Sequence, residues 1–402
     1  MRYEKVKIGD ICTKVTSGGT PKSTNFAFYN PKEVPWLKTG EVNYCRIYDT
    51  ETYISKEGLI RSSAKLIPEN SVIVAMYGQG NTAGRVAINK IPLCTNQACC
   101  NLVINHVIAD YEYVYYALST LYDKLVSLKN GGAQPNLNAG IVKGVEIPFP
   151  DLQIQHRIAQ TLANYDNLIE NNKKQIKLLE EAAQHLYKEW FIDLRFPGYE
   201  DVKVVDGVPK GWRKQRIAEF GEIVTGKTPS TAQKQYYGGN IPFVKIPDMH
   251  DCIYPIETEV TLTIEGANTQ RNKFIPKDSI MVSCIATVGL VNIAIEACQT
   301  NQQINSIVLG DSEDLYYVFF SMKRLKTLLE GVGSNGATMT NVNKNKFSNL
   351  EVLYPTEELR KAYYDFCAPI FKKIYTLCMS NHKLSQIRDR LLPKLMSGEL
   401  EV

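Results

Sequence analysis

Apolar residues recur along two stretches of the chain at alternating intervals of four and three residues, the period of a coiled-coil seam. The first stretch begins near residue 152 and has one polar interruption, Asn172. The second begins at Leu359 and contains more polar positions and Pro369, so we expect a weaker helix that kinks or restarts there. Neither helix can leave such a stripe in water, and the pattern predicts that the two pack against each other, antiparallel. The predicted seam residues are Ile158, Leu162, Tyr165, Ile169, Asn172, Ile176, Leu179, Leu186, Trp190, Leu377, Leu384, Ile387 and Leu391.

The segments that precede the two helices have the pattern of small mixed domains. Short β-branched runs such as SVIVAMY (71–77) and SIMVSCI (279–285) are bounded by Gly, Asn and Pro, which is typical of strands joined by turns. In each segment a stretch with apolar residues at helical spacing follows, at residues 110–128 and 314–332. Each segment is therefore expected to fold as strands with a covering helix.

The two segments are copies of one another at an offset of about 205–209 residues. VPWLKTGEV (34–42) matches IPFVKIPDM (241–249), and LIPENSVIVA (66–75) matches FIPKDSIMVS (274–283). The tripeptide Thr-Asn-Gln occurs at 95–97 and again at 300–302. Because the matched positions are widely spaced and keep their order, we infer a tandem duplication with diverged loops.

The expected fold class is α+β: two tandem mixed α/β domains separated by two long helices packed as an antiparallel coiled coil, with pseudo-twofold symmetry. The expected boundaries are 1–150 for the first head, 151–195 for the first helix, 196–355 for a linker and the second head, and 356–402 for the C-terminal helix. At ~1.5 Å per residue, a helix from Leu152 to Trp190 is about 58 Å long, enough to hold two heads apart.

The composition is that of a folded chain, since 44% of the 402 residues are hydrophobic and 22% are charged. No apolar run approaches the roughly 20 residues that span a bilayer, and the N-terminus carries no secretory signal, so we expect a cytoplasmic protein without membrane contact. Ten cysteines without a CxxC pair indicate reduced thiols. With 46 basic against 42 acidic residues the net charge is only +4, so nucleic-acid binding would be weak without help from partners.

The sequence around each candidate catalytic motif does not fit the motif's function. Residues 221–228, GEIVTGKT, match the phosphate-loop pattern GxxxxGK[ST], but the preceding RKQRIAEF is a poor central strand and Pro229 follows in place of a helix. The first copy reads TSGGTP at this point, without a lysine. The five histidines show no HExxH motif and no metal-ligand spacing. The sequence therefore predicts a binding protein rather than an enzyme, with no catalytic site, no metal and no cofactor.

Function is then expected in polar residues of the Gly/Asn-rich loops. Asn, Gln, Arg, Lys and Asp side chains read base edges in the major groove of DNA, at about 1–3 kcal/mol for each good pair. Residues identical in both copies, such as Gln97 and Gln302, are expected to support the scaffold or to touch phosphate, since reading two different sequences requires readers that differ. The candidate DNA-binding residues are Thr20, Lys22, Ser23, Lys38, Thr39, Glu41, Tyr77, Gln79, Asn81, Arg85, Gln134, Asn136, Lys227, Ser230, Gln233, Lys245, Asp248, His250, Thr287, Asn335, Thr338, Asn343 and Lys344.

Several short motifs have a distinctive order and spacing: GTP (19–21), LYKEWFIDLRFPGYE (186–200), VPKGW (208–212), KTP (227–229) and LLPKLMSGELEV (391–402). By these motifs the chain resembles, over essentially its whole length, the specificity (S) subunits of Type I restriction-modification systems. The resemblance implies that each repeat is a target recognition domain for one half of a bipartite, asymmetric site on double-stranded DNA. It implies that the helices set the gap between the halves and dock two DNA-methyltransferase (M) subunits, which restriction-translocase (R) subunits can join. Methylation, cleavage, S-adenosylmethionine and ATP would belong to those partners.

Two other hypotheses stay open on the residues alone. One is a nucleotide hydrolase whose phosphate loop carries Lys227. The other is a two-headed binding or scaffold protein for a glycan or peptide, with no role on DNA.

Overall fold

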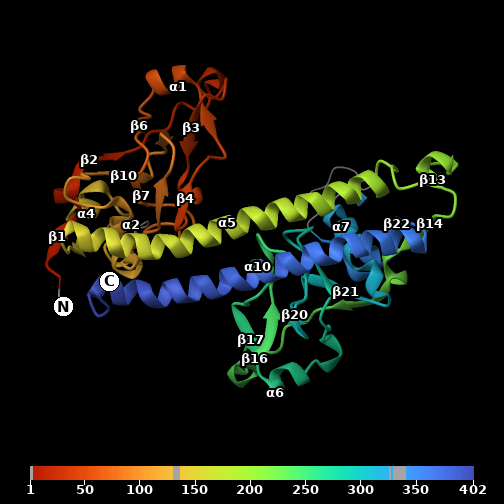
Figure 1. The fold of residues 1–402 in the computed structure, drawn as a ribbon. Coiled ribbons are helices and arrows are strands. Elements are labelled where there is room, and N and C mark those ends of the chain that lie inside the picture. The colour runs from red at the N-terminus through yellow and green to blue at the C-terminus, as the bar shows by residue number, and fades with distance from the viewer. Residues whose placement is uncertain (1–2, 130–135, 326, 329–340) are drawn as a thin grey trace. The chain divides into compact units, whose positions relative to one another are not determined.

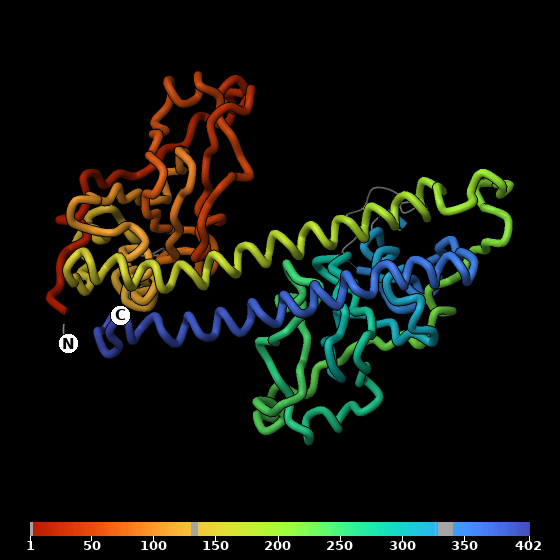
Figure 2. The backbone as a smooth tube through the Cα atoms, viewed as in Figure 1, coloured from red at the N-terminus to blue at the C-terminus, as the bar shows by residue number. Residues whose placement is uncertain are grey.

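The computed structural model describes residues 3–129, 136–325, 327–328 and 341–402. It divides into two compact units, unit 1 from Met1–Leu168 with Leu384–Val402 and unit 2 from Ile169–Lys383. Each unit thus consists of one head and one end of each long helix. Figure 2 shows this for unit 1, where the red N-terminal and blue C-terminal parts of the chain meet at the yellow start of the first long helix.

Head 1, which runs from β1 to β11, is built on a five-stranded sheet in the order β2-β10-β7-β8-β4. A four-stranded sheet, β5-β3-β9-β6, and the pair β1-β11 complete it. Its strands are β1 Lys5–Lys7, β2 Cys12–Ser17, β3 Val34–Leu37, β4 Cys45–Ile47, β5 Tyr53–Ile54, β6 Leu66–Ile67, β7 Val72–Ala75, β8 Val86–Asn89, β9 Leu93–Thr95, β10 Cys99–Ile104 and β11 Glu146–Pro148. Its helices are α1 Lys56–Ile60, α2 Tyr111–Ser119, α3 Tyr122–Ser127 and α4 Ala139–Gly144. Alternate residues of β7 and β8 pack with α2 in one apolar core, and the residues between them, Ile73, Ala75 and Ala87, belong to a second buried cluster.

Head 2, which runs from β14 to β22, has the corresponding sheets β15-β21-β18-β19 and β17-β16-β20 and the pair β14-β22, and the short pair β12-β13 precedes it. The strands are β12 Val204–Val205, β13 Val208–Pro209, β14 Arg213–Arg216, β15 Gly221–Thr225, β16 Tyr237–Val244, β17 Val260–Leu262, β18 Ile280–Ser283, β19 Val291–Ile293, β20 Gln299–Thr300, β21 Ile304–Leu309 and β22 Glu351–Tyr354. The helices are α6 Ile264–Asn268, α7 Leu315–Lys323 and α9 Lys344–Ser348.

The two heads fold alike because the repeat places the same local signals in both. The helices α1 and α6 are capped at their N-termini by Ser55 and Thr263, and α4 and α9 by Asn138 and Asn343. Each of these side chains accepts a hydrogen bond from a backbone N–H in the first turn, which stabilises the helix start. The corresponding pairs β3 with β9 and β16 with β20 are both parallel. Head 1 has a second parallel pair, β4 with β8. This confirms the predicted α+β architecture of two mixed domains.

The long helices α5 (Leu152–Phe191) and α10 (Glu357–Ser397) are the yellow-green and blue helices of Figure 1. In unit 1, Ile158 and Leu162 from the start of α5 share a buried cluster with Leu395 from the end of α10. In unit 2, the Asn172 side-chain amide donates to the Asn381 side-chain oxygen at 2.8 Å. Residue numbers on α10 fall as those on α5 rise, so the helices are antiparallel, as predicted.

Helix α10 differs from the sequence expectation in two ways. It continues without a break through Pro369, where a kink or restart was expected. Pro369 and Asp365 are both exposed, so water can satisfy the Asp365 carbonyl that loses its intrahelical hydrogen bond. Ile387, which the spacing places in the seam, is 45% exposed, because Arg388 beside it turns inward to bind Asp166.

The contact between the helices in unit 1 is a buried polar network. Arg388 forms an ion pair with Asp166, which also accepts a hydrogen bond from the Tyr116 hydroxyl at 2.5 Å. Arg46 in turn donates to the Tyr116 oxygen at 3.3 Å and pairs with Glu112 at 3.3 Å. Burial, and after it the Asp166 carboxylate, raises the pKa of the Tyr116 hydroxyl, so it keeps its proton and donates. The network connects β4, α2, α5 and α10.

Unit 2 has an apolar core where unit 1 has this network. By the alignment of the two copies, the positions of Asp166, Arg388, Tyr116, Arg46 and Glu112 are taken by Phe371, Ala183, Phe320, Ile253 and Tyr316. All five are buried, and the ring centres of Tyr316 and Phe320 lie 4.4 and 6.0 Å from that of Phe371. The duplicated halves thus contact the helices through different chemistry.

We expect Arg388→Ala to lower the free energy of unfolding by about 3 kcal/mol, because it leaves the buried Asp166 carboxylate without its ionic partner. Asp166→Ala should cost less, because Arg388 is partly exposed and keeps its ion pair with Asp389 at 2.8 Å. The double variant should lose clearly less than the sum of the two, since it removes both charges. Urea denaturation followed by circular dichroism measures all three. Strictly additive losses would contradict the coupling.

Candidate functional site

The strand register brings the candidate loops of each head to one edge of its main sheet. In head 1, β2 and β7 flank β10, and Ser17 pairs with Cys100 while Ala75 pairs with Cys99. Both strands therefore end opposite the start of β10, next to the turn formed by residues 95–97. The loops that follow β2 and β7 leave the sheet side by side. The same register joins β15, β21 and β18 in head 2.

At this edge of head 1, the segment after β2 is pressed onto the turn. The Gly18 N–H donates to the Cys99 carbonyl at 3.2 Å, and the Gly19 N–H donates to the Thr95 carbonyl at 2.9 Å. A Cβ atom on Gly18 would lie 2.2 Å from the Thr95 carbonyl oxygen. Only glycine permits so close a backbone approach. We call this contact of the Gly-x-Thr-Pro segment with the Thr-Asn-Gln turn the junction.

Head 2 has the same junction, and this explains the phosphate-loop pattern at residues 221–228. The Gly226 N–H donates to Ile304 at 3.1 Å and the Lys227 N–H to Thr300 at 2.9 Å, both through carbonyl oxygens. A Cβ atom on Gly226 would lie 2.2 Å from the Asn301 carbonyl oxygen. Residues 221–225 are strand β15, not a loop. The glycine is therefore needed for packing, and these residues do not wrap a nucleotide phosphate.

The outer side of each junction has a threonine–glutamine pair. The Thr20 hydroxyl donates to the Gln97 side-chain oxygen, and Thr228 donates to the Gln302 oxygen at 2.7 Å. Both glutamines are exposed, whereas the threonines of the same turns, at 95 and 300, are buried. The candidate DNA-binding residues include neither glutamine, and the signal for them is that the tripeptide is identical in both copies.

The candidate DNA-binding residues have different environments. Gln134, Asn335 and Thr338 lie outside the described residues. Thr39 is buried at 8% exposure. Partly buried members are Glu41, Tyr77, Arg85, Lys245 and Asp248. Exposed members are Thr20, Lys22, Ser23, Lys38, Gln79, Asn81, Asn136, Lys227, Ser230, Gln233, His250, Thr287, Asn343 and Lys344.

Both acidic candidates, Glu41 and Asp248, accept hydrogen bonds from backbone N–H groups. The Glu41 carboxylate accepts from the Lys38 N–H at 2.9 Å and from the Glu51 N–H at 3.0 Å. Asp248 makes the two corresponding bonds in head 2, at 2.8 and 2.9 Å. These carboxylates fix the short 3-10 turns that follow β3 and β16. These two carboxylates therefore serve to hold the shape of their loops.

The glycine-rich loop between β7 and β8, which contains four candidates, is held from two sides. The Leu137 N–H donates to the Met76 carbonyl at 3.0 Å, so the segment that contains Asn136 runs beside this loop. The Tyr122 hydroxyl donates to the Asn81 carbonyl at 3.0 Å. The first of these bonds recurs in head 2 at 2.7 Å, between Val342 and Cys284. Asn136 and the β7–β8 loop thus belong to the same edge as the junction.

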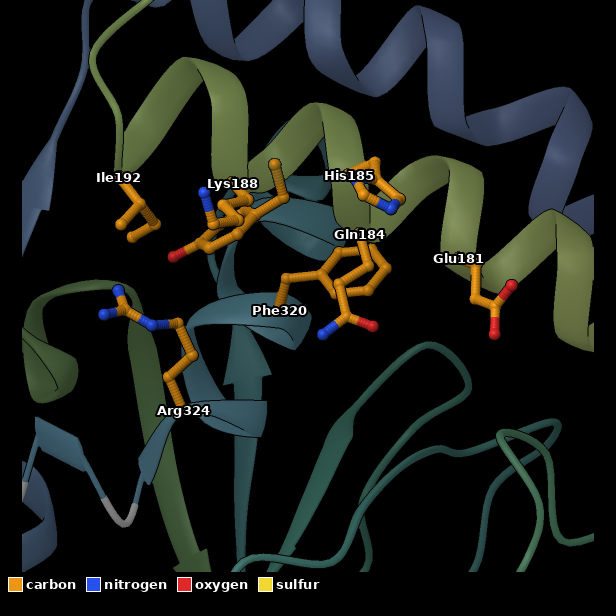
Figure 3. Close-up of a pocket in the computed structure, with 8 residues that line it drawn as sticks. Glu181, Gln184, His185, Lys188, Ile192, Phe320 and Arg324 are labelled. Atoms are coloured by element: carbon orange, nitrogen blue, oxygen red, sulfur yellow. The ribbon is translucent and has the colours of Figure 1, made fainter.

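Unit 2 also contains a cavity of about 480 Å³ on its helices (Figure 3). Its lining comes from the last turns of α5 and Ile192 just after them, from Phe320 on α7 and from Arg324 just after α7. Arg324, Lys188 and His185 provide nitrogen atoms around an apolar floor, and Glu181 lies at one end. The cavity is formed by the helix end and its contact with α7, not by the candidate loops.

The ten cysteines are all free thiols. Burial raises the pKa of Cys94 and of Cys284 to about 11, so both stay protonated at neutral pH. Among the residues that the structure describes, no helix combines the length and the apolar character needed to cross a bilayer.

Comparison with known proteins gives one consistent match. The family model described as "Type I restriction modification DNA specificity domain" matches residues 2–181 and again 209–376. The specificity subunit of the Type I restriction enzyme HindI from Haemophilus influenzae is 28% identical over 99% of this chain and 99% of its own length. The MjaIX specificity subunit of Methanocaldococcus jannaschii is 28% identical over 100% of this chain and 94% of its own. The crystal structure of a Type-I restriction-modification system S subunit from M. genitalium superposes with a TM-score of 0.61 at 16% identity, covering 98% of this chain and 96% of that one, which shows a shared fold.

The junction predicts that alanine substitution changes stability very differently at two glycines of head 1. Gly18→Ala should destabilise the head by more than about 3 kcal/mol, because the new Cβ would collide with the Thr95 backbone. Gly40→Ala is the matched control, since nothing lies within 4 Å of its Cβ position, and should change stability by less than about 0.5 kcal/mol. Thermal and urea unfolding compare the two. Similar losses in both variants would contradict the packing role of Gly18.

Proposed function

The chain belongs to the Type I restriction modification DNA specificity family, whose domain it carries twice, and from this we propose that it is the subunit that reads DNA for a Type I restriction-modification complex. Each head recognises one half of a bipartite, asymmetric site, and α5 and α10 set the gap between the halves. The observation that carries the proposal is that the two heads share the strand register and the junction at one sheet edge but carry different exposed side chains there. Where head 1 has Lys22 and Ser23, head 2 has Ser230 and Thr231.

The exposed candidates supply the chemistry of base reading. Gln79 and Asn81 in head 1 and Gln233 in head 2 carry exposed side-chain amides of the kind that pair with adenine, and Lys22 is of the kind that pairs with guanine. Side chains with internal partners, such as the two loop-shaping carboxylates, act by holding the readers in place. We therefore assign direct reading to exposed loop residues that differ between the heads.

The two-headed design answers an energetic need. A few base pairs read by one head, at about 1–3 kcal/mol each, discriminate weakly against the roughly 10⁶ or more competing sites of a genome. Joining two heads makes the second binding event intramolecular, so their discrimination combines. The modest net charge of +4 fits a subunit that binds DNA together with other proteins.

The partners follow from the same proposal. Two DNA-methyltransferase subunits dock on the helices, and restriction-translocase subunits can join them in the cytoplasm, where the chromosome lies. These partners hold S-adenosylmethionine and ATP and perform methylation and cleavage, whereas this chain contributes recognition and no catalytic step.

Exchanging residues 1–150 for the first head of a related subunit should change one half of the methylated motif and leave the other half and the gap unaltered. The physical reason is that each head carries its own sheet edge and its own readers. Single-molecule sequencing of genomic DNA from cells with the hybrid chain reads both halves at once. A change in both halves would show that the heads do not read independently.

Inserting one heptad beside Asn172, with a matched heptad beside Asn381, should lengthen the gap and leave both half-sites unchanged. Seven residues add about 10.5 Å of helix, or roughly three base pairs at ~3.4 Å each, and preserve the 3.5-residue seam. The same sequencing readout applies. An unchanged gap with a normally folded protein would contradict the spacer role of the helices.

A further inference from the structure

The junctions of both heads expose hydrogen-bond donors that have no partner in the described part of the chain. Because the Gln97 side-chain oxygen accepts from the Thr20 hydroxyl, the amide NH₂ of Gln97 is directed away from this bond. Gln302 is oriented in the same way by Thr228. Both glutamines are exposed, and their NH₂ groups are therefore available to an acceptor from outside.

Head 1 adds an exposed lysine to this donor. The Lys38 ammonium lies 5.9 Å from the centre of the Trp36 ring, and the Trp36 indole N–H donates to the Gly19 carbonyl at 3.0 Å. This chain of contacts places Lys38 at the junction. Lys38 makes no ion pair with any described residue, so its charge is not neutralised locally.

Head 2 keeps such a lysine, but at a different position. Lys245, the counterpart of Lys38, is neutralised by Glu259 at 2.8 Å. Lys227 stands at the position of Gly19 in head 1, within the junction itself. It is exposed and has no ion pair among the described residues. Although the individual lysines have moved, each junction retains one unpaired positive charge beside one outward glutamine amide.

We propose that each junction binds a phosphate of the DNA backbone, through the Gln97 amide and Lys38 in head 1 and through the Gln302 amide and Lys227 in head 2. The proposal rests on the function proposed above and divides the site into two parts. The junctions position the duplex on each head, and the diverged loops at the same sheet edge read its bases.

Phosphate fits the chemistry better than a base edge does. A glutamine whose oxygen is already engaged, together with a lysine, offers donors only, and phosphate oxygens are acceptors only. The threonine–glutamine pair is identical in the two heads, whereas readers of an asymmetric site must differ. Each junction has a positive charge, although it comes from a different position in each head. This suits an ionic contact with phosphate, which depends on charge more than on exact geometry.

The test uses the full chain, purified with the subunits that accompany it, and two duplexes. One duplex carries the methylated motif mapped in the cell, and the other has both half-sites scrambled. Gln97→Glu and Gln302→Glu should each weaken binding to both duplexes by about tenfold, because a carboxylate still accepts from the threonine but repels phosphate. Lys38→Gln and Lys227→Gln should each reduce the slope of log K against log salt by about one.

The matched controls are Asn272→Asp and Lys277→Gln, exposed changes of the same charge in head 2 outside the junction, which should leave binding within twofold. The glutamate variants should melt at the wild-type temperature and methylate the wild-type motif. The proposal is overturned if they bind as the wild type does, if they alter the motif, or if their loss of binding follows a loss of folded protein. If the wild type binds both duplexes equally, base reading fails, whereas a tenfold loss in the variants still supports the phosphate contacts.

Discussion

The antiparallel pairing of α5 and α10 is the constraint on which both units depend, because each unit buries one end of this pair beneath its own head. In unit 1 the contact is ionic and centres on Asp166 and Arg388. In unit 2 the same positions are apolar and centre on Phe371. If the helix end that packs in one unit were placed in the other, it would leave either a charge without its partner or a gap where a ring should pack. Either would lower the free energy of unfolding by several kcal/mol. The two chemistries therefore specify which ends belong together and in which register. Under the proposed function, in which these helices set the gap between the half-sites, a fixed register is a functional requirement.

The duplication separates what must be the same in both heads from what must differ. The junction glycines, the threonine–glutamine pairs and the loop-shaping carboxylates recur with nearly the same hydrogen bonds in each head. The side chains that protrude from the loops around them have diverged. Under the proposed function, this division lets one fold present two different readers. It also explains why a literal phosphate-loop pattern appears in only one copy. There the pattern arises because a junction glycine is followed by Lys227.

Much of this architecture follows from sequence periodicity alone. The 3.5-residue spacing predicts both long helices and their antiparallel contact, and the repeat predicts two similar α+β heads. Periodicity fails where a polar residue replaces an apolar one in the interior. Arg388 is only partly exposed and turns inward to pair with Asp166, while its apolar neighbour Ile387 faces water, and no spacing rule anticipates such an exchange. Pro369 illustrates the same limit, since its effect depends on whether the freed carbonyl faces solvent. In the candidate site, residue type identifies polar loops, but it does not reveal that Glu41 is bound by its own backbone.

Whether two heads on one chain read the two halves of one DNA site can be decided by mapping methylated bases in cells with and without this chain. If each head reads one half, the map shows a single asymmetric motif of two specified parts separated by a fixed run of unspecified bases, present with the chain and lost without it. A methylation pattern that does not depend on the chain, or a continuous motif without an unspecified gap, would contradict it.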